Sequence, residues 1–554
     1  MVLRVIDKDF ASQIEAQIEA AAGDGARHVE YTITLPLLLD RTGDRILCHE
    51  VSAETAAVSA HLSERVHALY SQLSSNRAVL AKDGPISVTI TIGQQGFHKY
   101  YPHCPHRRFH SRRLRLLDAD KLPNLDFVYR LVVDTEYDSN FEHEFEDIRP
   151  LSLLAPLHCL SHLPAVHTLE LPWMWERPTL YAMPDKSWQN DGTRPWEGPL
   201  RDARHEFGAA LLLSPEGQDP SSATIRVPET LRRAVLYFWK ASQFPVEDHS
   251  LPRPDLVSPA PEDPVSLGLR KLAAQLEVFD LRALITPALF QTTEGGAARE
   301  VAQWSRMRRL KVEFHLASPD GLWYFDGPAD GRHNQRNYLD RKDENQTFAV
   351  GPEHYPREAA APEIEAEIHD VLEGRKSRMV STDPYDVHLF RVVPRRETVE
   401  PLLKAFAKAI ARDNMPRLAD AELFAWLCWR PRVEEDLEDD ESLLAECETY
   451  RWGVKYISST GQQQEEEEKI EGENRREGIV QWQVGDWRPG QDVLDVFEHL
   501  ATLICIPISS QLLEAVGPAA MVGFLSAVLT CSLAAFAFSR WACLGKRWVL
   551  CENV

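Results

Sequence analysis

The sequence is poor in cysteine, and its cysteines are not paired in metal-binding or redox spacing. Nine cysteines occur among 554 residues, and no Cys-x-x-Cys motif is present. Small disulfide scaffolds and zinc ribbons need a higher density or that spacing, so both classes are excluded. The first ten residues also lack the apolar run of a signal peptide. We therefore expect a cytoplasmic protein in a reducing compartment.

Signatures of catalysis are lacking as well. The chain has no Gly-x-x-x-x-Gly-Lys-Ser/Thr phosphate loop, no Gly-x-Ser-x-Gly elbow and no His-Glu-x-x-His zinc pair. We predict that the protein is not an enzyme and that it has no catalytic residue, cofactor or metal. An enzyme without a recognised motif is the alternative, which a deep pocket holding His205 or His315 with a carboxylate would favour.

Cations are fewer than anions. Lysine and arginine total 61 against 84 aspartates and glutamates, which gives a net charge of −23. Nucleic-acid binding depends on cations that neutralise phosphates, so nucleic acid is not expected as a partner. Hydrophobic residues at 44% and charged residues at 26% are typical of a globular protein with a packed core. The length leaves room for about two to four domains.

The densest group of potential metal ligands lies in a basic segment near residue 100. Four histidines and one cysteine fall within 13 residues there: His98, His103, Cys104, His106 and His110. Zinc needs ligands fixed by more than one element, and six cations between residues 98 and 115 would repel it. We interpret the segment as a solvated basic loop. Contact with RNA or phospholipid is the alternative.

Short β-rich runs alternate with helical stretches along the middle of the chain. The runs are residues 86–92, 127–133, 166–171, 234–239, 277–281, 309–314 and 420–426. Helical stretches precede several of them, for example residues 151–163 and 265–276. Residues 162–171, 275–281 and 307–314 have the Leu-x-x-Leu-x-Leu rhythm of a leucine-rich-repeat strand, whose alternate residues face the core.

The spacing of these strands is irregular. Strand centres near residues 169, 237, 279 and 311 lie 68, 42 and 32 residues apart, whereas regular leucine-rich repeats have a period of about 20–29 residues. Proline and charge in the intervening segments indicate long loops. We therefore predict the α/β class, as an irregular leucine-rich-repeat-like solenoid with long loops. An ordinary α/β or α+β domain is the alternative.

The regions on either side of the repeat-like body differ from it. Residues 1–84 are predicted to be a helical N-terminal region, with helices at about 7–22 and 53–73 whose apolar residues recur at helical spacing. The body is expected at residues 85–432. Its last strand and helix are expected at residues 479–500, after an insertion.

The predicted insertion, residues 433–478, is strongly acidic. It contains 16 aspartates or glutamates and 5 lysines or arginines, which gives a charge of −11. Such runs remain solvated because they offer too little apolar surface to bury. We predict that the insertion is disordered.

An apolar tail, residues 501–554, follows the body. Residues 515–538 carry no charge, and as a helix they would be about 36 Å long, enough to cross a hydrocarbon core of about 30 Å. We predict a candidate transmembrane helix at residues 515–538 that would anchor the protein to a membrane. A buried hairpin and an aberrant end of the reading frame are the alternatives.

Tryptophans gather on or beside the predicted strands. They are Trp173, Trp175, Trp196, Trp239, Trp323, Trp426, Trp429, Trp452, Trp482 and Trp487. Aromatic residues so placed are typical either of a protein-binding face or of the edges of a packed core. The pattern does not distinguish the two interpretations.

Five stretches resemble a group of large F-box-type proteins of filamentous fungi. They are residues 193–208 (TRPWEGPLRDARHEFG), 263–270 (DPVSLGLR), 279–287 (FDLRALITP), 307–325 and 480–489 (VQWQVGDWRP). The resemblance covers about residues 85–495. It implies a repeat-like α/β body that holds partner proteins. An F-box, where present, would bind a Skp-type adaptor of a ubiquitin ligase.

The resemblance also implies where an F-box would begin. This motif starts with Leu-Pro, and the match in this chain is the degenerate stretch Leu35, Pro36, Leu37 and Leu38 before the helix at 53–73. These residues would contact the adaptor. We therefore predict a protein-protein interaction module whose finer role is a substrate receptor of a ubiquitin ligase. A membrane-tethered scaffold without a ligase role is the alternative, next to the enzyme already named.

Overall fold

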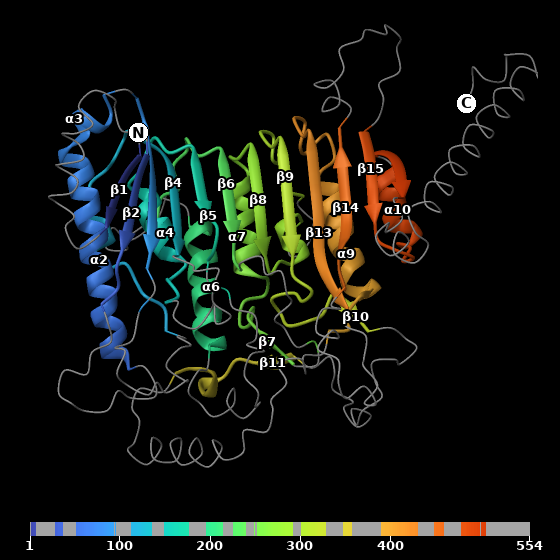
Figure 1. The fold of residues 1–554 in the computed structure, drawn as a ribbon. Coiled ribbons are helices and arrows are strands. Elements are labelled where there is room, and N and C mark those ends of the chain that lie inside the picture. The colour runs from blue at the N-terminus through green and yellow to red at the C-terminus, as the bar shows by residue number, and fades with distance from the viewer. Residues whose placement is uncertain are drawn as a thin grey trace, which may run out of the picture.

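One large sheet organises the computed structural model, and its strands are ordered as they are in the sequence (Figure 1). The structure describes residues 2–6, 28–36, 51–82, 84–93, 95, 112–135, 149–174, 176, 196–213, 225–239, 249, 252–291, 301–327, 347–356, 389–429, 448–458, 478–498 and 500–505. Within these ranges the sheet has twelve strands. They are β1 (Val2–Ile6), β2 (His28–Ile33), β3 (Ile86–Ile92), β4 (Val128–Thr135), β5 (Thr168–Leu171), β6 (Arg233–Tyr237), β8 (Val278–Ala283), β9 (Arg309–Phe314), β13 (Asp420–Trp429), β14 (Glu448–Ile457), β15 (Gly478–Gln483) and β16 (Ala501–Cys505).

Most neighbouring strands are parallel. Every pair from β1 to β13 is parallel, β14 is antiparallel to both β13 and β15, and β16 returns parallel to β15. Two short pairs lie outside this sheet: β7 (Arg253–Asp255) with β11 (Thr347–Ala349), and β10 (Phe325–Asp326) with β12 (Val393–Pro394). The predicted α/β class is confirmed, with a large and mostly parallel sheet.

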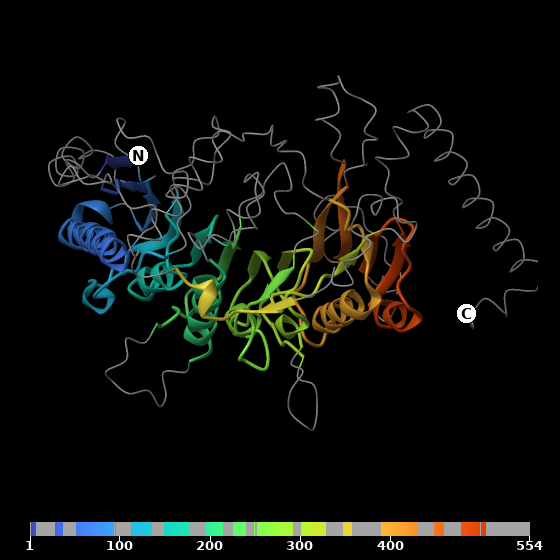
Figure 2. The same cartoon turned by 90° about the horizontal axis from the view of Figure 1, so that it is seen from below.

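The helices cover one face of the sheet (Figure 2). They are α2 (Ser52–Ser75), α3 (Arg77–Leu80), α4 (Leu154–Ser161), α6 (Glu197–Leu212), α7 (Pro264–Ala273), α9 (Arg396–Ala409) and α10 (Gln491–Glu498), with short 3₁₀ turns η3 (Ala119–Lys121), η4 (Pro287–Leu289) and η5 (Pro352–His354). The apolar residues that alternate along each strand, such as Leu310, Val312 and Phe314 on β9, are buried against this layer. The core therefore lies between one face of the sheet and the helices.

The seven strands expected from β-rich runs are all confirmed. β3 and β9 have the predicted bounds, and the others agree within a few residues. The helices expected at residues 53–73, 151–163 and 265–276 correspond to α2, α4 and α7. Local periodicity was sufficient to predict these elements because each run places its apolar residues on one face.

Two adjacent helices, α6 and α7, approach closely at glycines. A Cβ atom on Gly208 would lie 2.3 Å from the backbone carbon and oxygen of Pro264, and one on Gly268 would lie 3.0 Å from the Gly208 oxygen. Asp263 caps α7 by accepting a hydrogen bond from the Ser266 backbone N–H at 2.9 Å. This cap and the small residues fix where α7 begins against α6.

The prediction for the N-terminal region needs correction. β1 and β2 lie within residues 1–84, and β2 pairs with β3 along its whole length. The predicted border at residue 84 therefore falls inside the sheet. The residues between the two strands, including the helix expected at 7–22, lie outside the described residues. Strands β1 and β2 were missed because their alternating pattern is short and adjoins stretches of helical spacing.

The prediction of disorder is wrong for part of the acidic insertion. Residues 448–457 form β14, which lies between β13 and β15. The acidic residues lie mainly before and after this segment, whereas Tyr450, Trp452 and Val454 provide the alternating apolar face of a strand. The strand was missed because the average composition of the whole insertion is strongly acidic. The remainder of residues 433–478, apart from Ser458 and Gly478, lies outside the described residues.

The last expected elements are found in part. β15 and α10 match the strand and helix predicted at residues 479–500. β16 extends the sheet into the segment predicted as an apolar tail. The expected anchor at residues 515–538 lies outside the described residues, and no helix among those described is both long and apolar enough to cross a membrane.

Candidate protein-binding face

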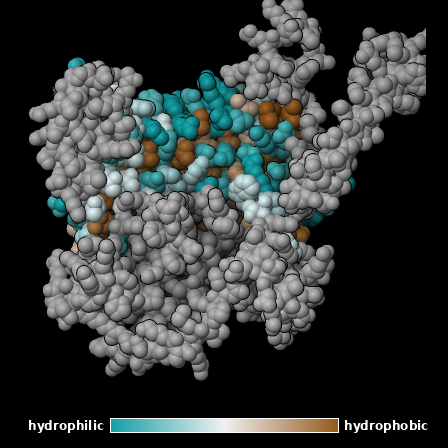
Figure 3. Space-filling model, in the orientation of Figure 1, coloured by the Kyte–Doolittle hydropathy of each residue, from teal (hydrophilic) through white to brown (hydrophobic). Residues whose placement is uncertain are grey.

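The face of the sheet opposite the helices is lined by every second residue of the parallel strands. On β2, β5 and β9 the residues facing the helices are buried, and the intervening ones are mostly more accessible. Figure 3 views the molecule from this side and shows a largely hydrophilic surface with scattered hydrophobic patches over the described strands. We call this surface the helix-free face.

Strand register aligns the side chains of the helix-free face in rows between β4 and β13. The first row is Arg130, Thr168, Arg233, Val278, Arg309 and Asp420, and the second is Val132, Glu170, Val235, Asp280, Lys311 and Glu422. The first, here called the basic row, holds three cations and one carboxylate, and the second, the acidic row, holds three carboxylates and one cation. Two adjacent bands of opposite charge therefore run across the strands.

Ion pairs between neighbouring strands hold these charges in place. Arg130 donates to Glu170 at 2.6 Å, and Arg309 pairs with Asp420 at 3.3 Å. Lys311 pairs with Asp280, with 3.6 Å between nitrogen and oxygen. Accessible pairs of this kind stabilise the fold by at most about 1 kcal/mol each. Their main effect is to orient charged groups that still reach solvent.

A third row, nearer the carboxyl ends of the strands, is less solvated. The Arg282 guanidinium forms an ion pair with Glu313, with 2.9 Å between nitrogen and oxygen, and lies 4.3 Å from the ring centroid of Tyr237. Burial raises the pKa of Glu313, and burial together with nearby Asp280 raises the pKa of Tyr237 to about 12. The tyrosine therefore remains neutral, with a hydroxyl that can donate.

Trp426 projects from β13 on the helix-free face with 49% of its surface exposed. Its ring meets the Phe424 ring edge to face, with 6.4 Å between centroids. The Arg451 guanidinium covers the same phenylalanine at 3.8 Å from the ring centroid and also pairs with Glu422. An exposed indole is thus supported by a packed ring and by fixed charges.

The other described tryptophans are buried or partly buried. Trp173, Trp304, Trp323, Trp452 and Trp482 belong to the core, and Trp196, Trp239, Trp429 and Trp487 are partly buried. Trp175 lies outside the described residues. Core packing therefore accounts for most of this group, whereas Trp426 has the exposure that a binding contact requires.

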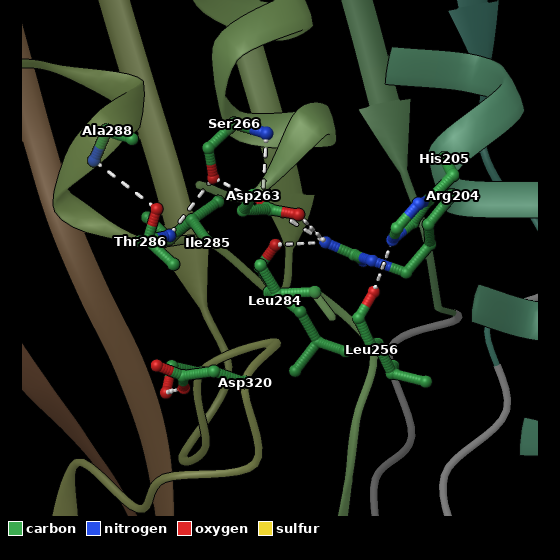
Figure 4. A network of polar contacts seen from close by, with 12 residues as sticks. Arg204, His205, Leu256, Asp263, Ser266, Leu284, Ile285, Thr286, Ala288 and Asp320 are labelled. Carbon is green, nitrogen blue, oxygen red and sulfur yellow. Dashed lines mark hydrogen bonds and ion pairs between the residues drawn. The ribbon is translucent and has the colours of Figure 1, made fainter. Parts of the chain in front are cut away.

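A buried ionic cluster lies at the carboxyl ends of β5, β6 and β8 (Figure 4). Arg204 on α6 donates to Glu176, to Asp263 at 3.2 Å and to the Leu284 carbonyl at 3.1 Å. Burial alone lowers the pKa of Arg204, but Glu176 and Asp263 outweigh it and raise the pKa above its usual value. The cluster joins the segments that follow β5 and β8 to the start of α7.

The enzyme alternative would be favoured by a deep pocket that holds His205 or His315 with a carboxylate, and both histidines have structural contacts. The Nε2 atom of His205 is 3.1 Å from the Leu256 carbonyl oxygen (Figure 4). The Nδ1 atom of His315 accepts a hydrogen bond from the Ala317 backbone N–H at 3.1 Å, and its ring meets that of Trp239 edge to face. Burial, followed by the nearby Arg253 cation, lowers the pKa of His315 to about 3.

Replacing His315 with asparagine is expected to flatten the acid side of the stability profile. Because the folded-state pKa is about 3 and the unfolded value is about 6.5, the unfolded chain binds an extra proton between these values. Stability due to this group is complete above pH 6.5 and falls as pH decreases toward 3, by up to about 1.4 kcal/mol per pH unit. Asparagine can accept the same N–H but does not titrate.

Urea unfolding of the wild type and of His315→Asn between pH 7 and pH 5 measures this difference. Leu213→Asn, at an exposed residue that does not titrate, is the control, and its profile is expected to run parallel to that of the wild type. A His315→Asn profile as steep as the wild-type profile would contradict the assignment.

The residues predicted to contact an adaptor are in different environments. Leu35 follows β2 and is buried in the core, with 2% of its surface exposed. Pro36 is exposed, and its carbonyl accepts a hydrogen bond from the Gln95 side chain at 3.0 Å. Leu37 and Leu38 lie outside the described residues. The structure therefore places the Leu35 side chain in the core, where it is not accessible to an adaptor.

The predicted basic loop near residue 100 is also only partly described. His98, His103, Cys104, His106 and His110 lie outside the described residues. No group of three or more metal-ligand residues occurs in the part of the chain that is described.

The charged rows of the helix-free face were not predicted from the sequence. Their signal is the alternation of charged and apolar residues, as in Arg309–Phe314 (RLKVEF).

Comparisons with family models, with curated proteins and with solved structures find no match. The resemblance to fungal F-box-type proteins therefore stays a prediction. The geometry of the sheet and of its side chains is the remaining indication of function.

Proposed function

We propose that this protein is a non-catalytic protein-interaction module and that its architecture is an irregular leucine-rich-repeat-like solenoid. Sequential parallel strands with helices on one face support the solenoid (Figures 1 and 2). The observation that carries the functional proposal is the helix-free face, where charged rows accompany an exposed tryptophan. Burial of a supported aromatic residue is a common source of protein-binding energy.

The occupant that fits this face is a segment of a partner protein with charges of both signs. Its acidic side chains would lie over the basic row, near Arg233 and Arg309, and its basic side chains over the acidic row. An apolar side chain would pack on Trp426. Opposite bands of charge favour one orientation of the segment, because reversal would place like charges together.

Replacing Trp426 with alanine is expected to weaken binding of such a partner at least tenfold, because the indole is a large and exposed apolar side chain on this face. Arg233→Glu is expected to weaken it by a smaller factor that diminishes at high salt. Partners are recovered with the tagged full-length protein, identified, purified and then titrated directly against each variant.

Leu213→Ala is the control for this experiment. Leu213 is as exposed as Trp426, at 51%, but it directly follows α6 in the helical layer. Partner affinity should be unchanged in this variant. Partners that bind Trp426→Ala and Arg233→Glu as tightly as the wild type would overturn the proposal.

We further propose a more specific role for this module, as a substrate receptor of a ubiquitin ligase. It is supported by the sequence resemblance, while the buried position of Leu35 argues against adaptor contact through that side chain. The same purification tests it, because a Skp-type adaptor and a cullin should be recovered with the wild type and with Trp426→Ala alike. Their absence from both would leave a scaffold without a ligase role.

A further inference from the structure

One short segment, residues 347–356, crosses the end of the helical layer and is here called the strap. It contains β11 and the turn η5. β11 lies beside β7 below the large sheet, and the strap continues from there to the first turn of α6 (Figures 1 and 2). The strap does not belong to the helix-free face, so it provides a separate indication of function.

The first part of the strap is held as an added strand. β11 pairs with β7 in parallel, from Thr347 beside Arg253 to Ala349 beside Asp255. This pair is separate from the twelve-stranded sheet. Addition of a strand to a sheet edge is a common mode of peptide recognition, in which backbone hydrogen bonds give affinity and side-chain pockets give specificity.

Val350 is the aliphatic anchor of the strap. It is buried in a small apolar cluster whose other buried members are Leu200 on α6, Leu256 after β7 and Leu284 after β8. This cluster is distinct from the main core between the sheet and the helices. Departure of the strap would therefore expose the small cluster and leave the main core closed.

Tyr355 is the aromatic anchor, five positions further along. Its ring packs on Gly198 in the first turn of α6, where an added Cβ would lie 2.6 Å from the ring. Its hydroxyl accepts a hydrogen bond from Arg201 at 2.6 Å and donates to the Asp202 carboxylate at 2.8 Å. Burial, followed by the hydrogen bond to Asp202, raises the pKa of Tyr355, so the hydroxyl remains a donor at neutral pH. The glycine admits the ring, and the two charged residues select a hydroxyl.

Further contacts connect the two anchors. Arg201 donates to the Val350 carbonyl at 2.9 Å in addition to its bond with Tyr355. Within the strap, the Gly351 N–H donates to Nδ1 of His354 at 2.9 Å, and the His354 ring stacks on a phenylalanine of β11 with 4.9 Å between centroids. These internal contacts hold the anchors in a fixed relation, which lowers the entropy cost of binding such a segment.

We propose that the strap is an exchangeable internal ligand of the surface formed by β7 and the first turns of α6. It leaves this surface while the sheet and helices stay folded, and a segment of a partner protein with the same pattern takes its place. That segment is extended, adds a strand to β7 and carries an aliphatic residue five positions before a tyrosine. The separate apolar cluster and the separate strand pair support the proposal, because neither is part of the main core or of the large sheet.

A labelled peptide of residues 347–356 (TFAVGPEHYP), titrated against full-length protein by fluorescence anisotropy, tests the proposal. The recipient is Val350→Ala/Tyr355→Ala, whose own strap lacks both anchors. We expect saturable binding that is at least about tenfold tighter than binding to the wild type, because the attached strap of the wild type competes as a tethered ligand.

Changes in the peptide test the tyrosine anchor. A peptide with Tyr355→Phe should bind about tenfold more weakly, because it lacks the hydroxyl that bonds to two charged side chains. Glu353→Gln is the control, because Glu353 is exposed and pairs with His354 within the strap itself. This peptide should bind as the unchanged peptide does.

Changes in the recipient test the surface. Gly198→Ala, added to the recipient, places a methyl group where the tyrosine ring packs and should weaken peptide binding at least tenfold. Ala209→Val, an exposed change further along α6, should leave the affinity unchanged. Failure of the peptide to bind the folded recipient, or equal affinity with and without Gly198→Ala, would overturn the proposal.

Native-state hydrogen exchange of the wild type tests the same proposal without any variant. Amides of β11 should exchange through a local opening that is independent of denaturant, at least about tenfold faster than amides in the middle of α6. Exchange of β11 and α6 in a single cooperative unfolding event would show that the strap is an integral part of the fold, and would also overturn the proposal.

Discussion

Replacing Arg204 with methionine is expected to lower the free energy of unfolding by about 3–5 kcal/mol. The guanidinium is fully buried and lies between two buried carboxylates, those of Glu176 and Asp263. Methionine fills a similar volume but leaves both carboxylates without their cation in a site that excludes water. The cost therefore comes mainly from the uncompensated negative charges and less from the loss of an attractive pair.

Arg308→Met is the comparison that separates a buried ion cluster from an exposed pair. Arg308 contacts Glu277 at 3.6 Å, and both side chains are accessible to solvent, so the expected cost is about 0–1 kcal/mol. Urea midpoints at an unchanged denaturant slope measure both variants. Equal midpoints for the two variants would show that the cluster does not stabilise the fold.

The contacts of Arg204 and Asp263 connect several segments of the chain. Asp263 accepts from Arg204 and also from the backbone N–H and the hydroxyl of Ser266, at 2.9 and 2.6 Å. Through Leu284 the cluster also holds the segment after β8. It therefore holds α6 and the start of α7 against the segments that follow β5 and β8.

Replacing Gly208 with valine is expected to destabilise the protein by about 2–3 kcal/mol, as overpacking of a tight contact does. A Cβ at this position would be 2.3 Å from backbone atoms of Pro264, which cannot rotate away as a flexible side chain can. α6 and α7 would have to separate. This outcome is opposite in sign to the usual effect of removing a glycine from a helix, which is stabilising by up to about 1 kcal/mol.

Ala209→Val introduces the same side chain one position along α6. Ala209 is exposed, so the expected cost is the helix propensity of valine alone, about 0.5 kcal/mol. Thermal and urea unfolding of the two variants compare them directly. A Gly208→Val protein as stable as Ala209→Val would contradict the close helix contact.

Local patterns in the sequence were sufficient to predict the strands in which apolar and polar residues alternate throughout. In Arg309–Phe314 the apolar residues Leu310, Val312 and Phe314 occupy alternate positions, so their common face is specified without reference to any other strand. The helix at Ser52–Ser75 was predicted for the same reason, because its apolar stripe has helical spacing. These features depend on neighbours within a few residues.

The strands that were not predicted from the sequence are stabilised by pairing with distant segments. β14 lies in a strongly acidic stretch, and it is stabilised by hydrogen-bonded neighbours on both sides. β1 and β2 join the sheet through β3, so the predicted N-terminal region is continuous with the body. Composition averaged over a long window could not show either pairing.

The periodicity and motifs of this sequence by themselves determined the α/β class, eight of the twelve described strands of the large sheet and the absence of recognised catalytic signatures. Tertiary structure alone decided which side chains meet. The rows of the helix-free face require the register of β4 to β13, and the hydrogen bond from Arg112 to the Pro356 carbonyl joins residues that are 244 positions apart. Such proximity arises from strand pairing and helix packing, which place residues side by side whatever their distance along the chain.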